Sequence, residues 1–169
     1  MGHTIFTTKR LRLEKIGIEH KEDLYRLLSN PKVHKYFQKA LDKEESGEFF
    51  EKVQQRYQTD GHCFWAVIRK SDNAFLGICG LLSQTIDGKQ EIEVGYRISD
   101  EFWNQGFGTE AARGCVGYAS DHLKLSSLIS LIRSMNQPSI RVAEKNGFRL
   151  EKETMFQGLL HRVYRLYLN

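Results

Sequence analysis

The segment from Trp103 to Ala111 places two closely spaced glycines, Gly106 and Gly108, directly before a predicted helix. Glycine lets the backbone approach an anion closely, and the unpaired N–H groups of a helix's first turn can donate hydrogen bonds to that anion. This chemistry needs backbone groups and no particular side chain. A tight turn from strand to helix accounts for the same glycines equally well, so the segment alone leaves both interpretations open.

Two familiar phosphate loops can be tested against these glycines. A Walker loop needs Lys and then Ser or Thr after its last glycine, whereas Thr109 and Glu110 stand there, so no nucleoside triphosphate site is expected. The glycines do fit the dinucleotide pattern, and Arg133 at the end of the next predicted strand could meet a 2′-phosphate. The antiparallel strands predicted before the loop do not build the doubly wound sheet of such a site. An NADP-binding oxidoreductase is therefore the weaker alternative.

Hydrophobic periodicity predicts the elements that hold this loop. Helices are expected over Glu22–Ser29, Asp42–Gln58, Phe107–Leu123 and Gln137–Lys145. Strands are expected over Arg10–Lys15, Phe64–Arg69, Phe75–Leu82, Glu91–Ile98, Ser127–Ile132, Arg149–Phe156 and His161–Leu168. Short turns between residues 64 and 98 indicate an antiparallel meander, and the strand–helix–strand–helix passage after it indicates a parallel centre. The predicted fold class is α+β, and Gly95 inside an apolar run predicts a bulge or a close backbone approach.

The composition limits the class of protein. With 169 residues, 40% of them hydrophobic, and no linker or repeat, one domain over residues 1–169 is expected. The net charge of +4 is scattered along the chain and no apolar stretch approaches the ~20 residues of a membrane span, so neither nucleic acid nor membrane is an expected partner. Three cysteines in apolar surroundings favour reduced thiols and a cytoplasmic location. The six histidines lack the spacing of a zinc site, so no metal is predicted.

Four segments in order resemble the Gcn5-related N-acetyltransferase (GNAT) family. The stretch from Trp103 to Gly108 resembles its acetyl-CoA loop, with Trp103 where the general pattern has Arg or Gln; Ile92–Ile98 resembles the strand before that loop, and Asn136–Phe148 the second cofactor segment. Thr8–Leu13 resembles the first strand of the branch of ribosomal-protein N-terminal acetyltransferases, where tryptophan in the loop is usual. The resemblance implies a mostly antiparallel sheet with a central parallel pair splayed around acetyl-CoA. It also implies an acyltransferase that moves an acetyl group to a primary amine.

Such a transfer needs a base, because a lysine amine titrates near ~10.4 and an α-amine near ~7.8. The resemblance implies that Glu93, beside the strand glycine, is that base; an outward surface residue is the alternative interpretation. Glu91 and Glu110 are weaker candidates, and Glu110 also suits the helix dipole.

The leaving CoA thiolate gains from a proton donor. Ser139 is the leading candidate by resemblance, with first-turn helix capping as its alternative role, and Tyr96 and Tyr118 are the tyrosines that could replace it.

The resemblance also implies which residues bind the cofactor. Backbone groups from Val94 to Tyr96 would face the thioester carbonyl, and the glycine loop would bind the pyrophosphate. Asn136 would bind the pantetheine arm, although helix capping alone explains this residue. Arg141 and Lys145 would meet the outer phosphates. The full expected set is Val94, Tyr96, Gln105, Gly106, Phe107, Gly108, Thr109, Asn136 and Arg141.

The acceptor is the least determined part. An acidic run with nearby aromatic residues would suit a cationic amine, although a solvated helix face is the favoured interpretation of the run. A protein or peptide N-terminus ranks ahead of small amines because of the branch resembled, and a homodimer stays open. A CoA-binding sensor without turnover is the alternative from another class. The run is Glu44, Glu45, Glu48 and Glu51, and the aromatic residues are Tyr36, Phe37, Phe49 and Phe50.

Overall fold

Eight strands form one mixed sheet in a computed structural model that describes residues 3–37 and 39–169; residues 1–2 and 38, which the single-domain prediction includes, lie outside it. The strand order is β1-β2-β3-β4-β5-β6-β8-β7, and β5 and β6 are the parallel pair. The strands are β1 Thr4–Thr7, β2 Leu11–Lys15, β3 Phe64–Arg69, β4 Phe75–Ile86, β5 Lys89–Ile98, β6 Ser127–Ile132, β7 Arg149–Phe156 and β8 Leu159–Tyr167.

Four α-helices cover the sheet: α1 Lys21–Leu28, α2 Lys43–Asp60, α3 Phe107–Asp121 and α4 Gln137–Lys145. Their ends follow local sequence signals. Asp42 and Glu45 form a capping box at the start of α2, which ends at Gly61 in the left-handed conformation. The side chain of Asn136 caps α4 by accepting the backbone N–H of Ser139, as the sequence predicts.

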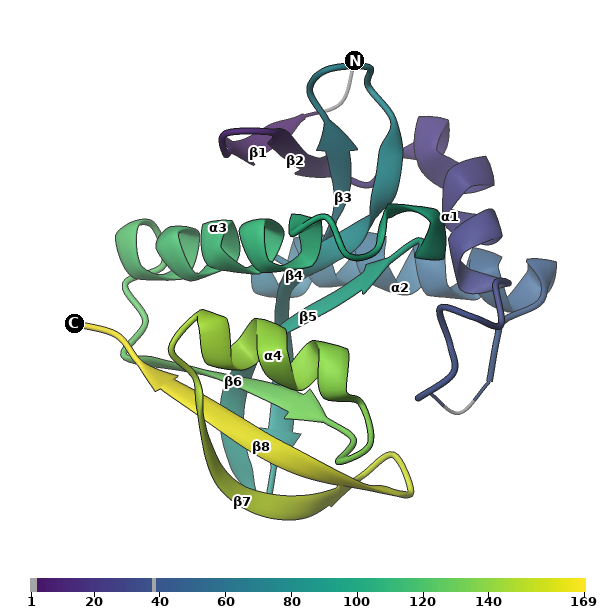
Figure 1. Cartoon of the computed structure of the whole chain (residues 1–169). Helices are drawn as coiled ribbons and strands as arrows, with labels where there is room; N and C mark the ends of the chain where they lie inside the picture. The colour runs from purple at the N-terminus through teal and green to yellow at the C-terminus, as the bar shows by residue number, and fades with distance from the viewer. Residues whose placement is uncertain (1–2, 38) are drawn as a thin grey trace.

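The helices lie on both faces of the sheet, with α3 and α4 on the near face and α2 behind it (Figure 1). Small residues on one side of α3, Ala111, Cys115 and Ala119, are fully buried and let it lie close to β4 and β5. Strands β5 and β6 pair at Glu93 and Ile129 and then diverge toward their carboxyl ends (Figure 1). The divergence opens the sheet at its centre.

The predicted elements are confirmed with three differences. Strand β1 is missing from the prediction, since four residues are too short for a periodic signal. The β4–β5 hairpin is longer than predicted and turns at Asp87 and Gly88, both with positive φ. The expected bulge at Gly95 is wrong: Gly95 pairs in continuous register with Gly80. The glycine leaves room for side chains and not for a closely approaching backbone, because a Cβ there would lie 2.9 Å from the Leu82 side chain. With one parallel pair, the sheet is not the doubly wound sheet of a dinucleotide-binding oxidoreductase.

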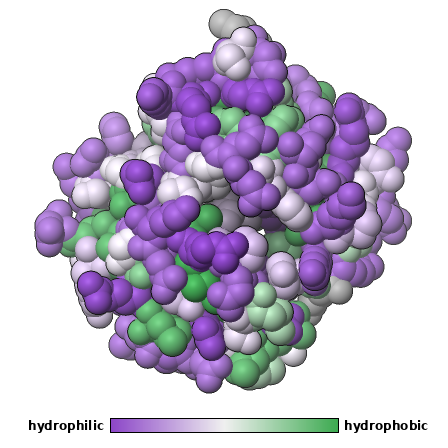
Figure 2. Space-filling view, viewed as in Figure 1, coloured by the Kyte–Doolittle hydropathy of each residue, from purple (hydrophilic) through white to green (hydrophobic). Residues whose placement is uncertain are grey.

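The surface is mostly hydrophilic on the face that Figure 2 shows, and apolar side chains gather in its lower part, where Figure 1 places β7 and β8. Leu150, Met155 and Leu160 of that hairpin are among the exposed large apolar residues. In the described part of the chain, no helix is long and apolar enough to cross a membrane. All three cysteines are buried and free, as expected of reduced thiols.

Candidate active site

A cavity of about 700 Å³ lies where β5 and β6 diverge. Its walls come from β5 and β6, the first turn of α4, the inner face of α2 and the β7–β8 turn. Residues between α1 and α2 complete the wall, namely His34, Tyr36, Phe37, Lys39 and Leu41. This is the predicted position, between the strand ending at Ile98 and the strand ending at Ile132. Splaying two parallel strands leaves backbone and side chains of both facing the same space, which is where a fold of this kind can bind a ligand.

Glu93 lies in this cavity, on the strand β5, with only 9% of its surface exposed. Nε2 of Gln84 donates a hydrogen bond to its Oε1 at 3.0 Å, and the backbone N–H of Leu131 donates to the same carboxylate. Burial raises the pKa of Glu93 to about 7, because desolvation outweighs both hydrogen bonds and the nearby charge of Arg97. A carboxylate that titrates near neutral pH inside a cleft is suited to proton transfer.

Ser139 and Tyr96 meet on the α4 side of the same cavity. The Tyr96 hydroxyl donates to the carbonyl oxygen of Ser139 at 3.0 Å, and burial raises the pKa of Tyr96 above its ordinary value. Asn136 also lines the cavity while it caps the helix. The structure therefore brings the two candidate proton donors together, Tyr96 from β5 and Ser139 from the first turn of α4.

The backbone of β5 points into the opening. The carbonyl of Val94 accepts a hydrogen bond from the Ser130 hydroxyl of β6 at 3.1 Å, so this edge of Val94 faces β6. Residues two apart on a strand face the same edge, so the N–H of Tyr96 also points toward the opening. The side chain of Val94 is buried, and only its backbone is available to a ligand.

The glycine loop forms the start of α3, outside the cavity just described. Gly106 is the N-cap with φ of +82°, a conformation that a side chain disfavours, while the first turn of the helix leaves N–H groups without intrahelical partners. Gln105 is exposed, and the side chain of Phe107 is buried, so Phe107 offers its backbone alone. A Cβ on Gly108 would find only ordinary contacts.

Arg10 and Glu110 fix this loop. Nη1 of Arg10 donates to the carbonyl of Gln105 at 3.0 Å, and its guanidinium lies 4.3 Å from the centroid of the Phe107 ring. Glu110 accepts hydrogen bonds from the Thr8 hydroxyl and from both the backbone and Nε of Arg10. Glu110 thus positions the loop and does not face the cavity. The cation beside the exposed loop fits the binding of an anionic diphosphate.

Known proteins match this chain in sequence and in fold. The sequence model described as an acetyltransferase (GNAT) domain matches residues 10–149. The Bacillus subtilis protein YkkB is 33% identical over 150 residues, which cover 88% of this chain and 87% of YkkB. This chain belongs to the GNAT acetyltransferase family.

Solved structures show the same GNAT fold. The GNAT-family acetyltransferase from Bacillus anthracis superposes with a TM-score of 0.82 at 23% identity, covering 95% of this chain and 96% of that one. RimL, the ribosomal L7/L12 alpha-N-protein acetyltransferase, gives a TM-score of 0.83 at 18% identity, covering 99% of this chain and 96% of RimL. The predicted family and its splayed sheet are confirmed.

Three weaker candidates of the sequence prediction do not reach the cavity of this GNAT domain. Arg165 binds Glu91 through two hydrogen bonds, the shorter of 2.6 Å. Tyr118 stacks on Phe6 and His122 at the β1 side of α3. Glu110 is held by Arg10. Of the three candidate bases Glu91, Glu93 and Glu110, Glu93 is the one that lines the cavity at the divergence of the strands.

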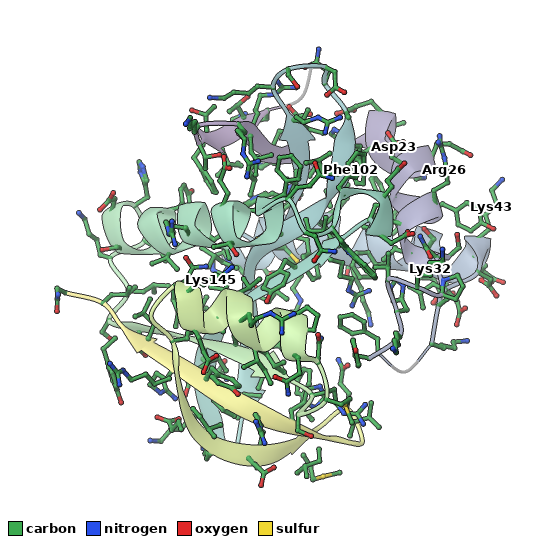
Figure 3. The ribbon with its side chains drawn as sticks, viewed as in Figure 1. Asp23, Arg26, Lys32, Lys43, Phe102 and Lys145 are labelled. Carbon is green, nitrogen blue, oxygen red and sulfur yellow. The ribbon has the colours of Figure 1, made fainter. Side chains whose placement is uncertain are left out.

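The residues expected near the outer phosphates lie on α4. Arg141 is an exposed side chain of this helix. Lys145 lies at its end, beside α3 in Figure 3. Asn146 connects the two helices, since its Nδ2 donates to the carbonyl of Thr109 at 3.3 Å and its Oδ1 accepts from Arg113. The end of α4 is therefore close to the first turns of α3.

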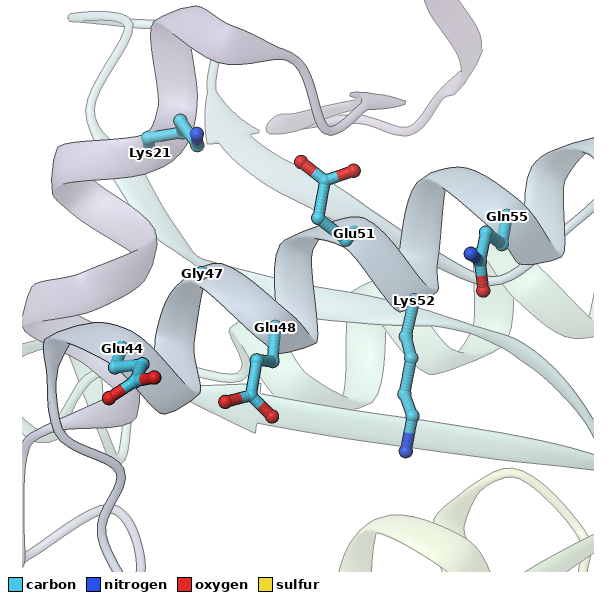
Figure 4. Close-up of a pocket in the computed structure, with 7 residues that line it drawn as sticks. All are labelled: Lys21, Glu44, Gly47, Glu48, Glu51, Lys52 and Gln55. Atoms are coloured by element: carbon cyan, nitrogen blue, oxygen red, sulfur yellow. The ribbon is translucent and has the colours of Figure 1, made fainter.

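Glu44, Glu48 and Glu51 of the acidic run are exposed and do not line the cavity, which agrees with the solvated helix face that the sequence favours. Glu44, Glu48 and Glu51 line a separate depression on the outer face of α2, with Lys21 of α1 beside them (Figure 4). Glu45 lines the cavity and is paired with Lys39 at 2.6 Å. Helical spacing alone does not show which face of α2 meets the sheet.

Sequence reasoning missed several residues of the cavity. Gln84 holds Glu93, and Arg97 and His34 form a polar pair in the wall. Arg133, which the sequence suggests only for a dinucleotide phosphate, lines the same cavity. Strand alternation from Glu93 was the available signal for Arg97, because residues 93 and 97 share one face of β5. Gln84 and His34 carried no such signal, since tertiary pairing brings them to the site.

Proposed function

We propose that this GNAT domain moves the acetyl group of acetyl-CoA to a protein or peptide N-terminus, with Glu93 as the base. The family's activity is acetyl-CoA-dependent N-acetylation. The observation that carries the proposal is the buried carboxylate of Glu93, held by Gln84 and Leu131 where β5 and β6 diverge. The branch that the sequence resembles, and the fold shared with RimL, support the choice of an N-terminal amine.

The pKa of Glu93 favours an α-amine over a lysine side chain. With the pKa of Glu93 at about 7, taking a proton from an α-ammonium of pKa ~7.8 costs about 1 kcal/mol. The same transfer from a lysine ammonium of pKa ~10.4 costs about 5 kcal/mol. A base of this strength is therefore matched to N-terminal amines, directly or through one water.

The residues that would hold acetyl-CoA fit its shape and charge. Acetyl-CoA supplies an activated acetyl thioester. The exposed loop around Gly106, with the Arg10 cation beside it, would bind the diphosphate, and the side chain of Asn136 would bind the pantetheine amides. The N–H of Tyr96, which points into the opening, would polarise the acetyl carbonyl.

Ser139 and Tyr96 are the residues that would supply a proton to the leaving CoA thiolate. The Ser139 hydroxyl belongs to the first turn of α4 and lines the cavity, and the Tyr96 hydroxyl is already oriented by the Ser139 carbonyl. Because the O–H group of Tyr96 already donates to that carbonyl, Ser139 is the proton donor we propose, and Tyr96 positions it.

Thiol release with a set of amines tests the proposal. Short peptides with a free α-amine should release CoA thiol, peptides with only a lysine amine should do so much more slowly, and N-formylated peptides should not react at the blocked end. Glu93→Gln should lower kcat by roughly 100- to 1,000-fold while acetyl-CoA affinity by calorimetry stays within about 2-fold. Acetyl-CoA binding without thiol release from any amine would instead support the CoA-binding sensor.

A further inference from the structure

Arg97 lies on the same face of β5 as Glu93, because residues four apart along a strand share a face. Its Nη1 donates to Nε2 of His34 at 3.0 Å, while Nδ1 of His34 lies 3.1 Å from the carbonyl oxygen of Asn30. A carbonyl only accepts, so the proton of His34 is on Nδ1 and the ring is neutral. Burial and the charge of Arg97 lower the pKa of His34 to about 4. His34 thus orients Arg97 without balancing its charge.

Three phenylalanine rings enclose the guanidinium. The Cζ atom of Arg97 lies 4.5 Å from the ring centroid of Phe37, 5.4 Å from that of Phe49 and 5.7 Å from that of Phe64. Burial lowers the pKa of Arg97 to about 10, so it remains a cation at neutral pH. Among the described residues no carboxylate lies within ion-pair distance of it, although the charge of Glu93, on the same face of β5, favours the cation. Glu93 and the ring contacts offset only part of the cost of burying the guanidinium.

Arg133 occupies the corresponding place on the other strand. Glu93 pairs with Ile129, and Arg97 and Arg133 each follow four residues later, where β5 and β6 diverge. Nε of Arg133 is buried and has no hydrogen-bond partner in the part of the chain that the structure describes. The nearby His161 has its pKa lowered by burial and by Arg133, so it is neutral at neutral pH as well.

The charges of the cavity wall are unbalanced. Its two carboxylates are Glu45, already paired with Lys39, and Glu93, whose pKa is raised. Lys52 adds to the two arginines on the cationic side, whereas Arg56 is paired with Asp60 at 3.5 Å. A low-dielectric cleft lined by one sign of charge concentrates ligands of the opposite sign. It also disfavours polycationic amines and the protonated form of the acceptor amine.

We infer that the acceptor carries an anionic oxyacid group, a carboxylate or a phosphate, which Arg97 and Arg133 bind while the acceptor amine lies at Glu93. This inference rests on the proposed function and deepens it. Arg97 follows Glu93 by four residues, which corresponds to roughly 13 Å along a strand. The long arginine side chains can shorten the distance between their guanidinium groups and the Glu93 carboxylate. The acid therefore stands several bonds from the amine, as on the side chain of the first or second residue of a peptide, or at the far end of a small amino acid.

Matched acceptor pairs test the inference. One arm uses C-terminally amidated tetrapeptides that differ only in Glu against Gln at the second residue; the other uses glutamate against glutamine and phosphoethanolamine against ethanolamine. The acidic member should have a kcat/KM about 10- to 100-fold higher, the effect of a charge-assisted bidentate contact. The arm with the larger ratio identifies a peptide or a small molecule as the source of the acid. Equal rates, or faster reaction of the neutral members in both arms, overturn the inference.

Variants show whether the two arginines cause the preference. Arg133→Gln and Arg97→Gln should each reduce the acid-to-amide ratio about 10-fold, and Arg97→Lys should restore part of it only. Arg26→Gln, on the exposed face of α1 (Figure 3), is the matched control and should leave the ratio unchanged. Arg133 lies at the edge of the wall, so the acid-to-amide ratio of Arg133→Gln can be measured even where Arg97→Gln does not fold. A ratio unaffected by Arg133→Gln and Arg97→Lys contradicts the assignment.

Binding without turnover separates this inference from the proposed function. The same peptide and small-molecule pairs are titrated by calorimetry into the wild-type chain saturated with CoA. Tighter binding of the acidic members, with no thiol release from any amine, keeps the anion site and overturns the transfer activity. Thiol release without any preference for the acidic members, in rate or in affinity, keeps the activity and overturns the anion site.

Discussion

The proposed cofactor site and the proposed acceptor site are built from different parts of the chain. On the cofactor side, the loop at Gly106, outside the cavity, and the edge of β5 at Tyr96, within it, present backbone N–H groups, and side chains such as Phe107 turn into the core. On the acceptor side, the wall is made of side chains, with Arg97, His34 and Glu93 facing the cavity.

This difference follows from what each side recognises. A diphosphate and a thioester carbonyl can be bound by N–H groups that every residue carries, so the sequence needs only glycine where space or positive φ is required. An acceptor is distinguished by its own charge and shape, which only side chains can match. The cofactor side is therefore a local motif, whereas the acceptor side is a meeting of distant segments.

The largest expected effect breaks the cofactor side. Gly106→Val should weaken acetyl-CoA binding by about 100-fold or more, because Gly106 has φ of +82° and a Cβ there would lie 3.3 Å from Nη2 of Arg10. Calorimetry with acetyl-CoA measures the loss. Gly117→Ala, with no atom near its Cβ, is the control on the same helix. Unchanged affinity in a folded Gly106→Val would show that the loop does not hold the cofactor.

A second prediction concerns the cost of burying Glu93 on the acceptor side. Its pKa is raised from 4.5 to about 7, so between these values the folded chain holds more protons than the unfolded chain and stability falls as pH rises. Glu93→Gln removes this penalty and should raise the free energy of unfolding at pH 8 by at most about 3 kcal/mol, with little change at pH 4. Urea denaturation at both pH values measures it. Equal effects at pH 4 and pH 8 would contradict the burial of a carboxylate.

A smaller effect is expected where the two sides meet. Ser139→Ala should lower kcat about 10-fold because a proton donor is lost, whereas Tyr96→Phe removes only the hydrogen bond to the Ser139 carbonyl and should cost less. Steady-state kinetics at saturating acetyl-CoA compare the two. A larger loss in Tyr96→Phe would assign the donor role to the tyrosine.

The smallest effect is expected outside the cavity. The triple variant Glu44→Gln, Glu48→Gln and Glu51→Gln changes only the outer face of α2, so kcat/KM should stay within about 2-fold for every acceptor (Figure 4). An acceptor rate that depends strongly on these three carboxylates would move the acceptor site to that face.

Local signals predicted most of the fold. The ends of α2 and α4, the glycine loop and the alternating strands depend on residues a few positions apart, and all were predicted within a few residues. Strand β1 was not predicted because its four residues gain their structure from pairing with β2. The bulge at Gly95 was wrong because the glycine is needed for space against Leu82, which the sequence places 13 positions away.

The sequence by itself determined the family, the order of the elements, and the backbone groups available to acetyl-CoA, because these depend on periodicity and on glycines near each other in the chain. The tertiary structure alone decided the environment of each charge. Burial raises the pKa of Glu93 to about 7 against the hydrogen bonds of Gln84 and Leu131. Arg97 lies against His34 and three phenylalanine rings and forms no ion pair among the described residues. Desolvation and pairing depend on distances across the folded chain, so no short-range pattern can specify them.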